Sequence, residues 1–364
     1  MPISAAETIT LAFQHTKRQL IQPFRFWQWT RLAFVGLLAG EAGSGSSFHL
    51  PPNFNTTHHA GSSGDFLKLA FPNVNPVLLA ALIAIVFVAG LIFAILMTYV
   101  SSVMRFILFD SVLAKECRIR QGWRRRQDAG WKYFWWQLGF ILAIFAGLIV
   151  LLGIPAALAF AMGWFHEPSQ HVLGLVLGGI LLFLLLFVFL VASAVIQVLT
   201  KDFVVPQMAL EGIGAVQGWR RLWPMIDAEL GGYAAYVGMK IVLAIGAGIV
   251  VALVGLILIL LVAIPVAGVA VATVLGGNAA GLTWNVFTIT AAVVAGCLLI
   301  AVMFYLVALI SVPVIVFFPA YSIYFFAARY RPLSLVLYPP PPPLSSDAGP
   351  APPGEPPFAP VPAG

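Results

Sequence analysis

Four long intervals of the chain contain no aspartate, glutamate, lysine or arginine. They enclose 36, 34, 33 and 88 residues and lie between Lys68 and Arg105, Lys132 and Glu167, Glu167 and Lys201, and Lys240 and Arg329. A helix needs about 20 mostly apolar residues to cross roughly 30 Å of hydrocarbon. The longest interval therefore has room for two crossings, joined by a turn at 276–278. These intervals are continuously apolar and do not alternate, which is typical of helices and not of barrel strands. We predict helical spans near 76–104, 133–162, 171–199, 233–272 and 286–318.

The composition agrees with a membrane protein. Of the 364 residues, 61% are apolar and only 9% are charged, whereas a soluble domain carries about 25% charged residues. This excludes an ordinary cytosolic enzyme and a disordered chain, and the two cysteines exclude a disulfide scaffold. The expected fold class is all-α, a polytopic helical membrane bundle.

A sixth span is expected over 24–43, where Arg25 and Arg31 would have to reach the membrane interface. With six spans and a cytoplasmic N-terminus, 18 of the 19 lysines and arginines lie inside and only Lys68 lies outside. With five spans the exceptions would rise to five. The positive-inside rule therefore favours about six transmembrane helices in the cell (inner) membrane, with both termini cytoplasmic.

The chain divides into three parts by composition. Residues 1–23 are expected to form an amphipathic interfacial helix, and residues 24–337 the helical membrane domain. The Pro-rich tail 338–364 holds 12 of the 26 prolines, so it should be extended or disordered. We interpret the tail mainly as a solvated spacer; a protein partner with an aromatic groove is the alternative.

The pentapeptide Gln-Gly-Trp-Arg-Arg occurs at 121–125 and again at 217–221, 96 residues later. At the same offset Arg105 aligns with Lys201. Two spans separate the copies, so both must lie on one face of the membrane. This pattern predicts a parallel internal repeat with units of about 105–199 and 201–318. Two unrelated basic clusters are the alternative.

The repeated segments also supply the predicted binding residues. Tryptophan favours the headgroup level, and arginine pairs reach lipid phosphates. The residues predicted at lipid headgroups are Arg118, Arg120, Trp123, Arg124, Arg125, Arg126, Trp219, Arg220 and Arg221. These arginines could instead serve only to orient the chain during insertion. The expected function is an integral membrane protein without catalysis that contacts anionic lipid headgroups; a transporter or permease-like subunit is the alternative.

The stretch Val205-Pro206-Gln207-Met208-Ala209-Leu210-Glu211-Gly212, followed by Gly218-Trp219-Arg220-Arg221 and a new span, resembles a prokaryotic membrane family of unknown function. That family is related to the membrane domain of glycerophosphodiester phosphodiesterases. The segments 12–17 and 29–33 are similar to its archaeal and bacterial members. The resemblance covers roughly 5–335 and implies an uncharacterised helical membrane protein. It carries no catalytic residues over, because a segment long enough for the phosphodiesterase domain is absent from this sequence.

No motif in the sequence indicates an enzyme. The glycine loops that bind nucleotides are missing, as are HExxH, CxxC and GxSxG. Five of the six histidines fall in expected outer loops without ligand spacing, so we expect no metal site and no cofactor. A pI near 9.5 does not indicate nucleic acid, because the cations lie where insertion requires them. Membrane lipids are the expected partner, and the oligomeric state is left open.

Overall fold

The computed structural model describes residues 4–22, 24–41, 76–164, 171–279 and 286–339. Within these ranges every regular element is helical, which confirms the all-α prediction. The elements are α1 (Ala5–Leu20), α2 (Phe26–Leu38), α4 (Pro76–Ala114), α5 (Ile119–Ala161), α6 (Val172–Leu199), the π-helix η1 (Thr200–Val204), α7 (Val205–Glu211), α8 (Ala215–Ala228), α9 (Leu230–Ala279), α10 (Val286–Ala327) and α11 (Arg331–Leu337).

Among the described residues, five helices are long and apolar enough to cross a membrane. They are α4, α5, α6 with its continuation through η1 and α7, α9, and α10. Each of the five spans predicted from the charge-free intervals corresponds to one of them. The 88-residue interval forms the pair α9 and α10, as its length requires. The prediction of a polytopic helical membrane protein is confirmed at this level.

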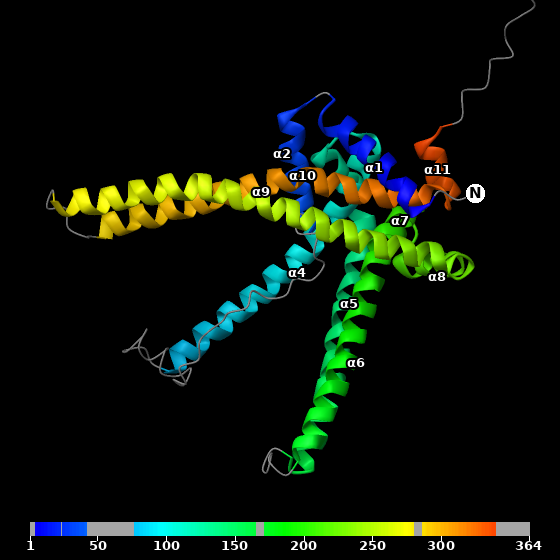
Figure 1. Cartoon of the computed structure of the whole chain (residues 1–364), viewed down its shortest axis with the longest axis horizontal. Coiled ribbons are helices and arrows are strands. Elements are labelled where there is room, and N and C mark those ends of the chain that lie inside the picture. Colours follow the sequence, from blue (N-terminus) through cyan, green and yellow to red (C-terminus); the bar gives the residue numbers. More distant parts are fainter. Residues whose placement is uncertain (1–3, 23, 42–75, 165–170, 280–285, 340–364) are drawn as a thin grey trace, which may run out of the picture.

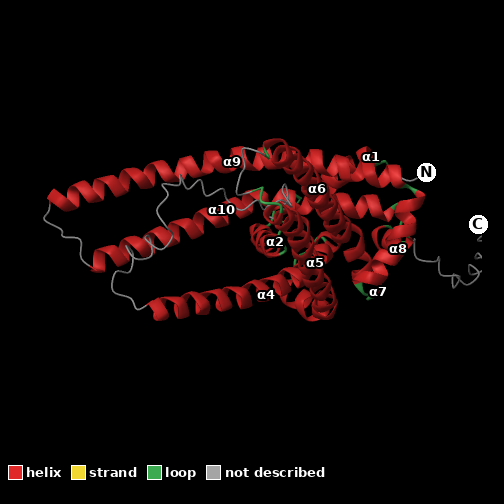
Figure 2. Ribbon diagram, turned by 90° about the horizontal axis from the view of Figure 1, so that it is seen from below, coloured by secondary structure: helices red, strands yellow, loops and turns green. Residues whose placement is uncertain are grey.

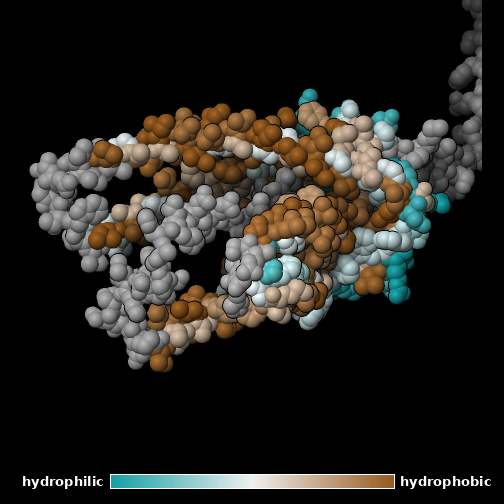
Figure 3. Space-filling model, turned by 60° about the horizontal axis from the view of Figure 1, so that its bottom comes forward, coloured by the Kyte–Doolittle hydropathy of each residue, from teal (hydrophilic) through white to brown (hydrophobic). Residues whose placement is uncertain are grey.

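The molecule consists of a packed hub and three diverging arms (Figure 1). We define the hub as α1, α2, η1, α7, α8 and α11 together with the adjoining ends of the long helices. The arms are α4, the pair α5 and α6, and the pair α9 and α10. Seen from below, α4 and the α9–α10 pair extend to the same side of the hub (Figure 2). The arms are apolar along their length, whereas hydrophilic residues gather at the hub (Figure 3).

The arms expose apolar side chains to their surroundings. In each of the five spanning helices, no more than 6% of the most apolar window is buried inside the protein. Phe87 and Phe183, for example, are each 70% exposed. A helix that is apolar all round must be covered by lipid or protein, so the arms are the part of the chain suited to the hydrocarbon.

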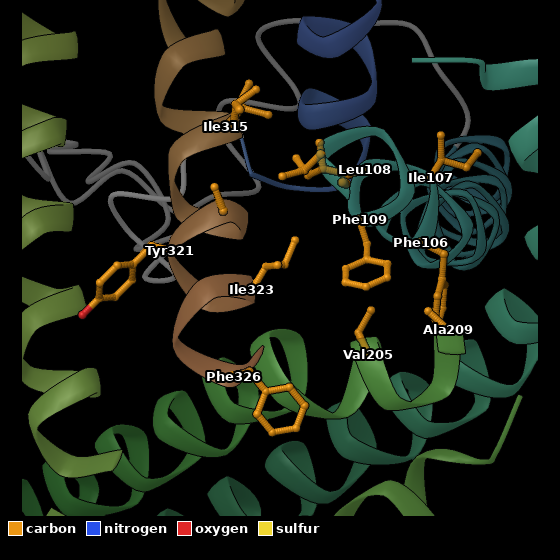
Figure 4. Close-up of a cluster of buried hydrophobic side chains, with 14 of the residues drawn as sticks. Phe106, Ile107, Leu108, Phe109, Val205, Ala209, Ile315, Tyr321, Ile323 and Phe326 are labelled. Atoms are coloured by element: carbon orange, nitrogen blue, oxygen red, sulfur yellow. The ribbon is translucent and has the colours of Figure 1, made fainter. Parts of the chain in front are cut away.

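The hydrophobic core lies in the hub. Side chains from α10, such as Tyr321 and Phe326, lie across from Phe109 of α4 and Val205 of α7 (Figure 4). The ring of Tyr236 on α9 stacks on Tyr321 at 5.0 Å. Because these residues come from helices far apart in sequence, the core joins the roots of all three arms.

Particular residues determine where the hub helices begin, end and touch. Ser4 begins α1 with a capping box, since Ser4 and Glu7 exchange hydrogen bonds between side chain and backbone. Gly212 ends α7 in a left-handed conformation with φ of 69°. A β-carbon at Gly36 would lie 2.4 Å from Ile315, so only glycine allows α2 to lie this close to α10.

The sixth span expected over 24–43 is not among the five spanning helices. Its helix, α2, has 13 residues and is about 20 Å long at 1.5 Å per residue, which is shorter than a crossing. Both ends of α2 are bonded to other parts of the hub. Gln28 donates to the Lys115 carbonyl, and Glu41, just after α2, pairs with Lys201. The chain re-emerges at Pro76, at the far tip of α4 (Figure 1). The return between these ends falls in 42–75, outside the described residues.

Helix α1 forms as expected, and its buried side packs on α10. Both α1 and α11 belong to the hub, so the first and last described residues lie at the same end of the molecule (Figure 1). The interfacial position of 1–23 stays a prediction. Most of the Pro-rich tail, 340–364, lies outside the described residues. Binding of a protein partner by this tail stays a prediction.

His15 links α1 to the core and should make the docking of α1 sensitive to pH. Its Nε2 lies 3.0 Å from the Val112 carbonyl, and its Nδ1 lies 3.1 Å from the Tyr324 hydroxyl. Burial lowers the pKa of His15 below 6.5, and nearby Lys115 adds to this, against hydrogen bonds that raise it. The unfolded chain therefore binds the proton more readily than the folded chain, and stability falls as pH drops below the unfolded value.

We expect the thermal unfolding midpoint of the parent protein to fall as pH is lowered from about 7.5 to about 5.5. The variant His15→Gln should show a smaller fall, because it lacks the titrating ring. Differential scanning fluorimetry in detergent measures both. Equal pH dependence in the two proteins would contradict a role for His15.

Candidate functional site

A cluster of charged side chains surrounds a small cavity in the hub, at the root of α4 and the α9–α10 pair. The cavity has a volume of about 40 Å³. Its ionisable lining residues are Glu41, Arg105, Lys201, Asp202 and Lys240. Leu108, Phe109, Val205, Pro206, Phe318, Pro319 and Ser322 complete the lining. Space for a water molecule needs about 10–15 Å³, so the cavity can hold a few waters or one small polar group.

Two ion pairs connect separate elements across this cavity. The ammonium of Lys201 lies 2.7 Å from Glu41, and each of these side chains is 12% exposed. The ammonium of Lys240 on α9 lies 2.5 Å from Asp202, which also accepts a hydrogen bond of 2.9 Å from the Tyr236 hydroxyl. The pairs join the segment after α2 to η1, and η1 to α9. The hub is thus held together by charge as well as by its apolar core.

Arg105 is the fifth charged member of the cluster and has a different environment. It is 8% exposed and donates to the Tyr133 hydroxyl at 2.6 Å and to the Ala39 carbonyl at 3.0 Å. Both acceptors are neutral. The Nε–H of Arg105 has no hydrogen-bond acceptor among the described residues. The cluster therefore contains three cations and two carboxylates.

The electrostatics of Glu41 reflect this excess of cations. Burial would raise the pKa of the Glu41 carboxyl, but Lys201, Arg105 and Lys240 outweigh burial and lower the pKa to about 2. The carboxylate is therefore ionised at neutral pH. Its negative charge is surrounded by three positive ones.

The π-helix η1 explains how Lys201 and Asp202 both face the cavity. A π-turn inserts one extra residue into a helix and often occurs at functional sites. Here η1 interrupts the long helix between α6 and α7. The adjacent residues Lys201 and Asp202 both line the cavity, and each pairs with a different element.

The structure separates the sequence-predicted arginines into two groups. Three have carboxylate partners in the hub: Arg118 pairs with Glu116, Arg126 with Asp110 and Arg221 with Glu211. The Arg126 pair is bidentate, with both N–O distances 2.7 Å. The second group is exposed and has no ion pair with any residue that the structure describes: Arg120, Arg124, Arg125 and Arg220.

The two predicted tryptophans are only partly exposed. Trp219 donates from Nε1 to the Thr200 hydroxyl at 3.1 Å, and Trp123 contacts the ring of Tyr99 edge-on. On α5 the exposed tryptophans are Trp131 and Trp135, at 51% and 56%. Contact of Trp123 and Trp219 with headgroups stays a prediction.

Sequence reasoning did not assemble the buried ion cluster. In the sequence, Lys240 bounds the longest charge-free interval, and Arg105 and Lys201 are aligned positions of the predicted repeat. A usable signal exists, since Arg105, Lys201 and Lys240 are each the charged residue that bounds a charge-free interval. Residues at such boundaries lie at similar depth. Glu41 is far away in sequence and does not bound any of these four intervals, so the same signal does not identify it.

Comparison with known proteins gives one result. A family model described as a family of unknown function, DUF7544, matches residues 3–336. No curated protein and no solved structure matched the chain. The match shows no link to the membrane domain of glycerophosphodiester phosphodiesterases, so that part of the resemblance stays a prediction. With nearly its whole length matched, the chain belongs to the DUF7544 family of unknown function.

Proposed function

We propose that this membrane protein has no catalytic role and contacts anionic lipid headgroups through exposed arginines of the hub. One observation carries the proposal. Arg120, Arg124, Arg125 and Arg220 are exposed, and none of them forms an ion pair with another described residue. They lie on α5 and α8, which contact each other, so their charges belong to one region of the hub. We call these four residues the arginine face.

The exposed tryptophans of α5 support a position of the arginine face near the membrane surface. Exposed tryptophan favours the membrane interface, so Trp131 and Trp135 support an interface level at the hub end of α5. Arg124 lies seven residues before Trp131, about 10 Å along the helix at 1.5 Å per residue. This distance is comparable to the Debye length of about 8 Å at physiological ionic strength. The long arginine side chain can bring its charge closer to the interface than the helix backbone is.

The distribution of charge supports a cytoplasmic hub. The described lysines and arginines all lie in the hub or at the hub ends of the arms, whereas hydrophobic surface covers the arms (Figure 3). By the positive-inside rule such an end faces the cytoplasm. We therefore propose that the hub and both termini are cytoplasmic, in a cell membrane.

Local geometry also supports the proposed repeat. Gly122 and Gly218 are the second residues of the two pentapeptides, and both are close to a preceding helix. A β-carbon would lie 3.1 Å from Ile107 at Gly122, and 2.7 Å from Val204 at Gly218. Arg105 and Lys201, aligned in the two units, line the same cavity. The units differ afterwards, because α5 continues into its arm whereas α8 ends before α9 begins.

Headgroup contact explains these observations better than transport does. The intervals 77–104, 133–161, 172–199 and 241–279 contain no ionisable Asp, Glu, Lys or Arg, and ion-coupled transporters place such groups within their spans. The charged cavity lies in the hub and has a volume of about 40 Å³. It does not extend along the arms.

Neutralising the arginine face should weaken binding to anionic lipid. Each Lys or Arg near an anionic leaflet contributes about 1 kcal/mol, so changing all four residues to Gln should reduce affinity by at least about tenfold. Binding of the purified protein to nanodiscs, with and without phosphatidylglycerol, measures the effect. The loss should shrink at high salt, because salt screens exposed charges.

A matched variant tests whether the position of the charges matters. Lys17, Arg18, Arg25 and Arg331 are also exposed, and changing them to Gln removes the same charge from other parts of the hub. Both variants must keep the orientation of the parent. An equal loss of affinity in both variants would mean that only net charge matters. Unchanged affinity in the arginine-face variant would mean that its arginines act only as insertion signals.

A further inference from the structure

We propose that the hub cavity binds a single oxyanion of the phosphoryl class, held by Arg105 with Lys201 and Lys240. The ligand is either the headgroup of an anionic lipid or free phosphate. This site is separate from the arginine face. It lies inside the hub, and none of its residues belongs to that face.

The first step of the argument is the unbalanced charge. Lys201 is paired with Glu41 at 2.7 Å, and Lys240 with Asp202 at 2.5 Å. These pairs use both carboxylates that line the cavity. Arg105 remains as the third cation, and the cluster has an excess of one positive charge. One bound anion would balance it.

The second step is the hydrogen bonding of Arg105. A guanidinium presents five N–H donors in a planar fork that matches phosphate and carboxylate oxygens. In this hub its described acceptors are a phenol and a carbonyl, and its Nε–H has none. A buried charged group without an ionic partner is unfavourable. An oxyanion supplies both the missing charge and the missing acceptor.

The third step is the space beside Arg105. The cavity of about 40 Å³ is lined by all three cations, and it is larger than one water requires. Apart from the paired carboxylates Glu41 and Asp202 and the hydroxyl residue Ser322, its remaining lining residues are apolar. The cavity is therefore suited to a compact polar group and too small for a large ligand.

The fourth step is the place of the cavity in the fold. It is lined by residues of α4, η1, α7, α9 and α10, at the root where α4 and the α9–α10 pair leave the hub on the same side (Figure 2). Apolar surface of both arms begins there. A lipid could place its phosphate in the cavity and its acyl chains along the arms, whereas free phosphate would use the cavity alone.

The test uses the full-length protein in detergent after removal of bound lipid. Short-chain phosphatidylglycerol and inorganic phosphate are titrated separately, with phosphatidylcholine as the zwitterionic control. Ligand that binds the folded state raises the unfolding midpoint, and native mass spectrometry counts retained molecules. Stabilisation by phosphatidylglycerol only identifies a lipid headgroup, and stabilisation by phosphate alone identifies a free anion. No stabilisation by either would overturn the proposal.

Three variants locate the binding. Arg105→Gln should weaken binding by about tenfold or more, because it removes the cation without a carboxylate partner. Glu41→Gln should have the opposite effect and tighten binding, since it raises the excess positive charge. The exposed Arg331→Gln, which belongs neither to the cavity nor to the arginine face, should bind as the parent does. Because Arg105 and Glu41 lie outside the arginine face, their effects separate failure of the present site from failure of the proposed function.

Arg105→Gln and Glu41→Gln are expected to change the affinity in opposite directions, so either variant can contradict the proposal. If Arg105→Gln binds like the parent, the site is wrong. If Arg105→Gln does not fold, Glu41→Gln decides the matter: tighter binding supports the cavity, and affinity equal to or weaker than the parent's overturns it.

Discussion

Replacing Asp202 with alanine should lower the free energy of unfolding by about 3–5 kcal/mol, the usual effect of removing one partner from a buried ion pair. Asp202 is 7% exposed. Without it, the Lys240 ammonium and the Tyr236 hydroxyl lose the carboxylate that accepts their hydrogen bonds. Lys240 would then be a buried cation beside two others. Chemical denaturation in detergent measures the change.

A surface aspartate provides the control for this prediction. Asp128 lies on α5, is exposed and has no ion pair among the described residues. Asp128→Ala should change stability by less than about 0.5 kcal/mol. If Asp202→Ala is equally mild, the ion pairs of the cavity do not hold the hub together.

Truncating Phe203 to alanine should destabilise the protein by about 3–5 kcal/mol, the range for a buried phenylalanine. Phe203 lies on η1 and is completely buried. Its ring contacts those of Tyr233, Tyr236 and Phe326 at 5.0–5.3 Å. Its removal leaves a cavity between η1, α9 and α10.

The same truncation in an arm should behave differently. Phe183 on α6 is 70% exposed, and in the membrane its neighbours would be lipid chains, so Phe183→Ala leaves no cavity in the protein. We expect a destabilisation of less than about 1 kcal/mol. A comparable loss for both variants would mean that the arms pack against one another or against a second chain.

The positions of the spanning helices could be predicted because one physical constraint dominates them. Hydrocarbon excludes charge, so the charge-free intervals predicted α4, α5, α6, α9 and α10. Their inner ends were harder to predict. For example, α5 begins at Ile119, 14 residues before the expected span at 133, because its basic first turns continue the helix into the hub.

Residues 24–43 show that the positive-inside rule is not sufficient to predict a spanning helix. That segment is apolar and has flanking arginines, and an even number of crossings gave the best distribution of charge. In the structure Gly36 packs against Ile315 and Glu41 pairs with Lys201. Tertiary contacts therefore hold α2 in the hub. Hydropathy alone does not distinguish a short membrane helix from a buried hub helix.

The candidate site was harder still to predict, because its parts come from four regions of the chain. Arg105 and Lys201 are aligned positions of the predicted repeat, and both line the cavity; the repeat itself stays a prediction. The pairing of Lys201 with Glu41 and of Lys240 with Asp202 depends on the π-turn of η1 and on the position of Glu41 just after α2. Neither feature has a sequence signature in a single chain.

The unequal lengths of the arms impose hydrophobic mismatch on any flat bilayer. From Lys240 to Ala279, α9 runs for about 60 Å at 1.5 Å per residue, whereas α4 from Pro76 to Arg105 runs for about 45 Å. Both exceed the roughly 30 Å of hydrocarbon. A long helix fits such a layer by tilting, by kinking or by thickening the bilayer locally, and we expect α9 to tilt more steeply than α4. A thinner or thicker membrane changes the two tilts by different amounts, so it turns the arms against each other at their common root. We therefore expect bilayer thickness to act as a mechanical load on the hub.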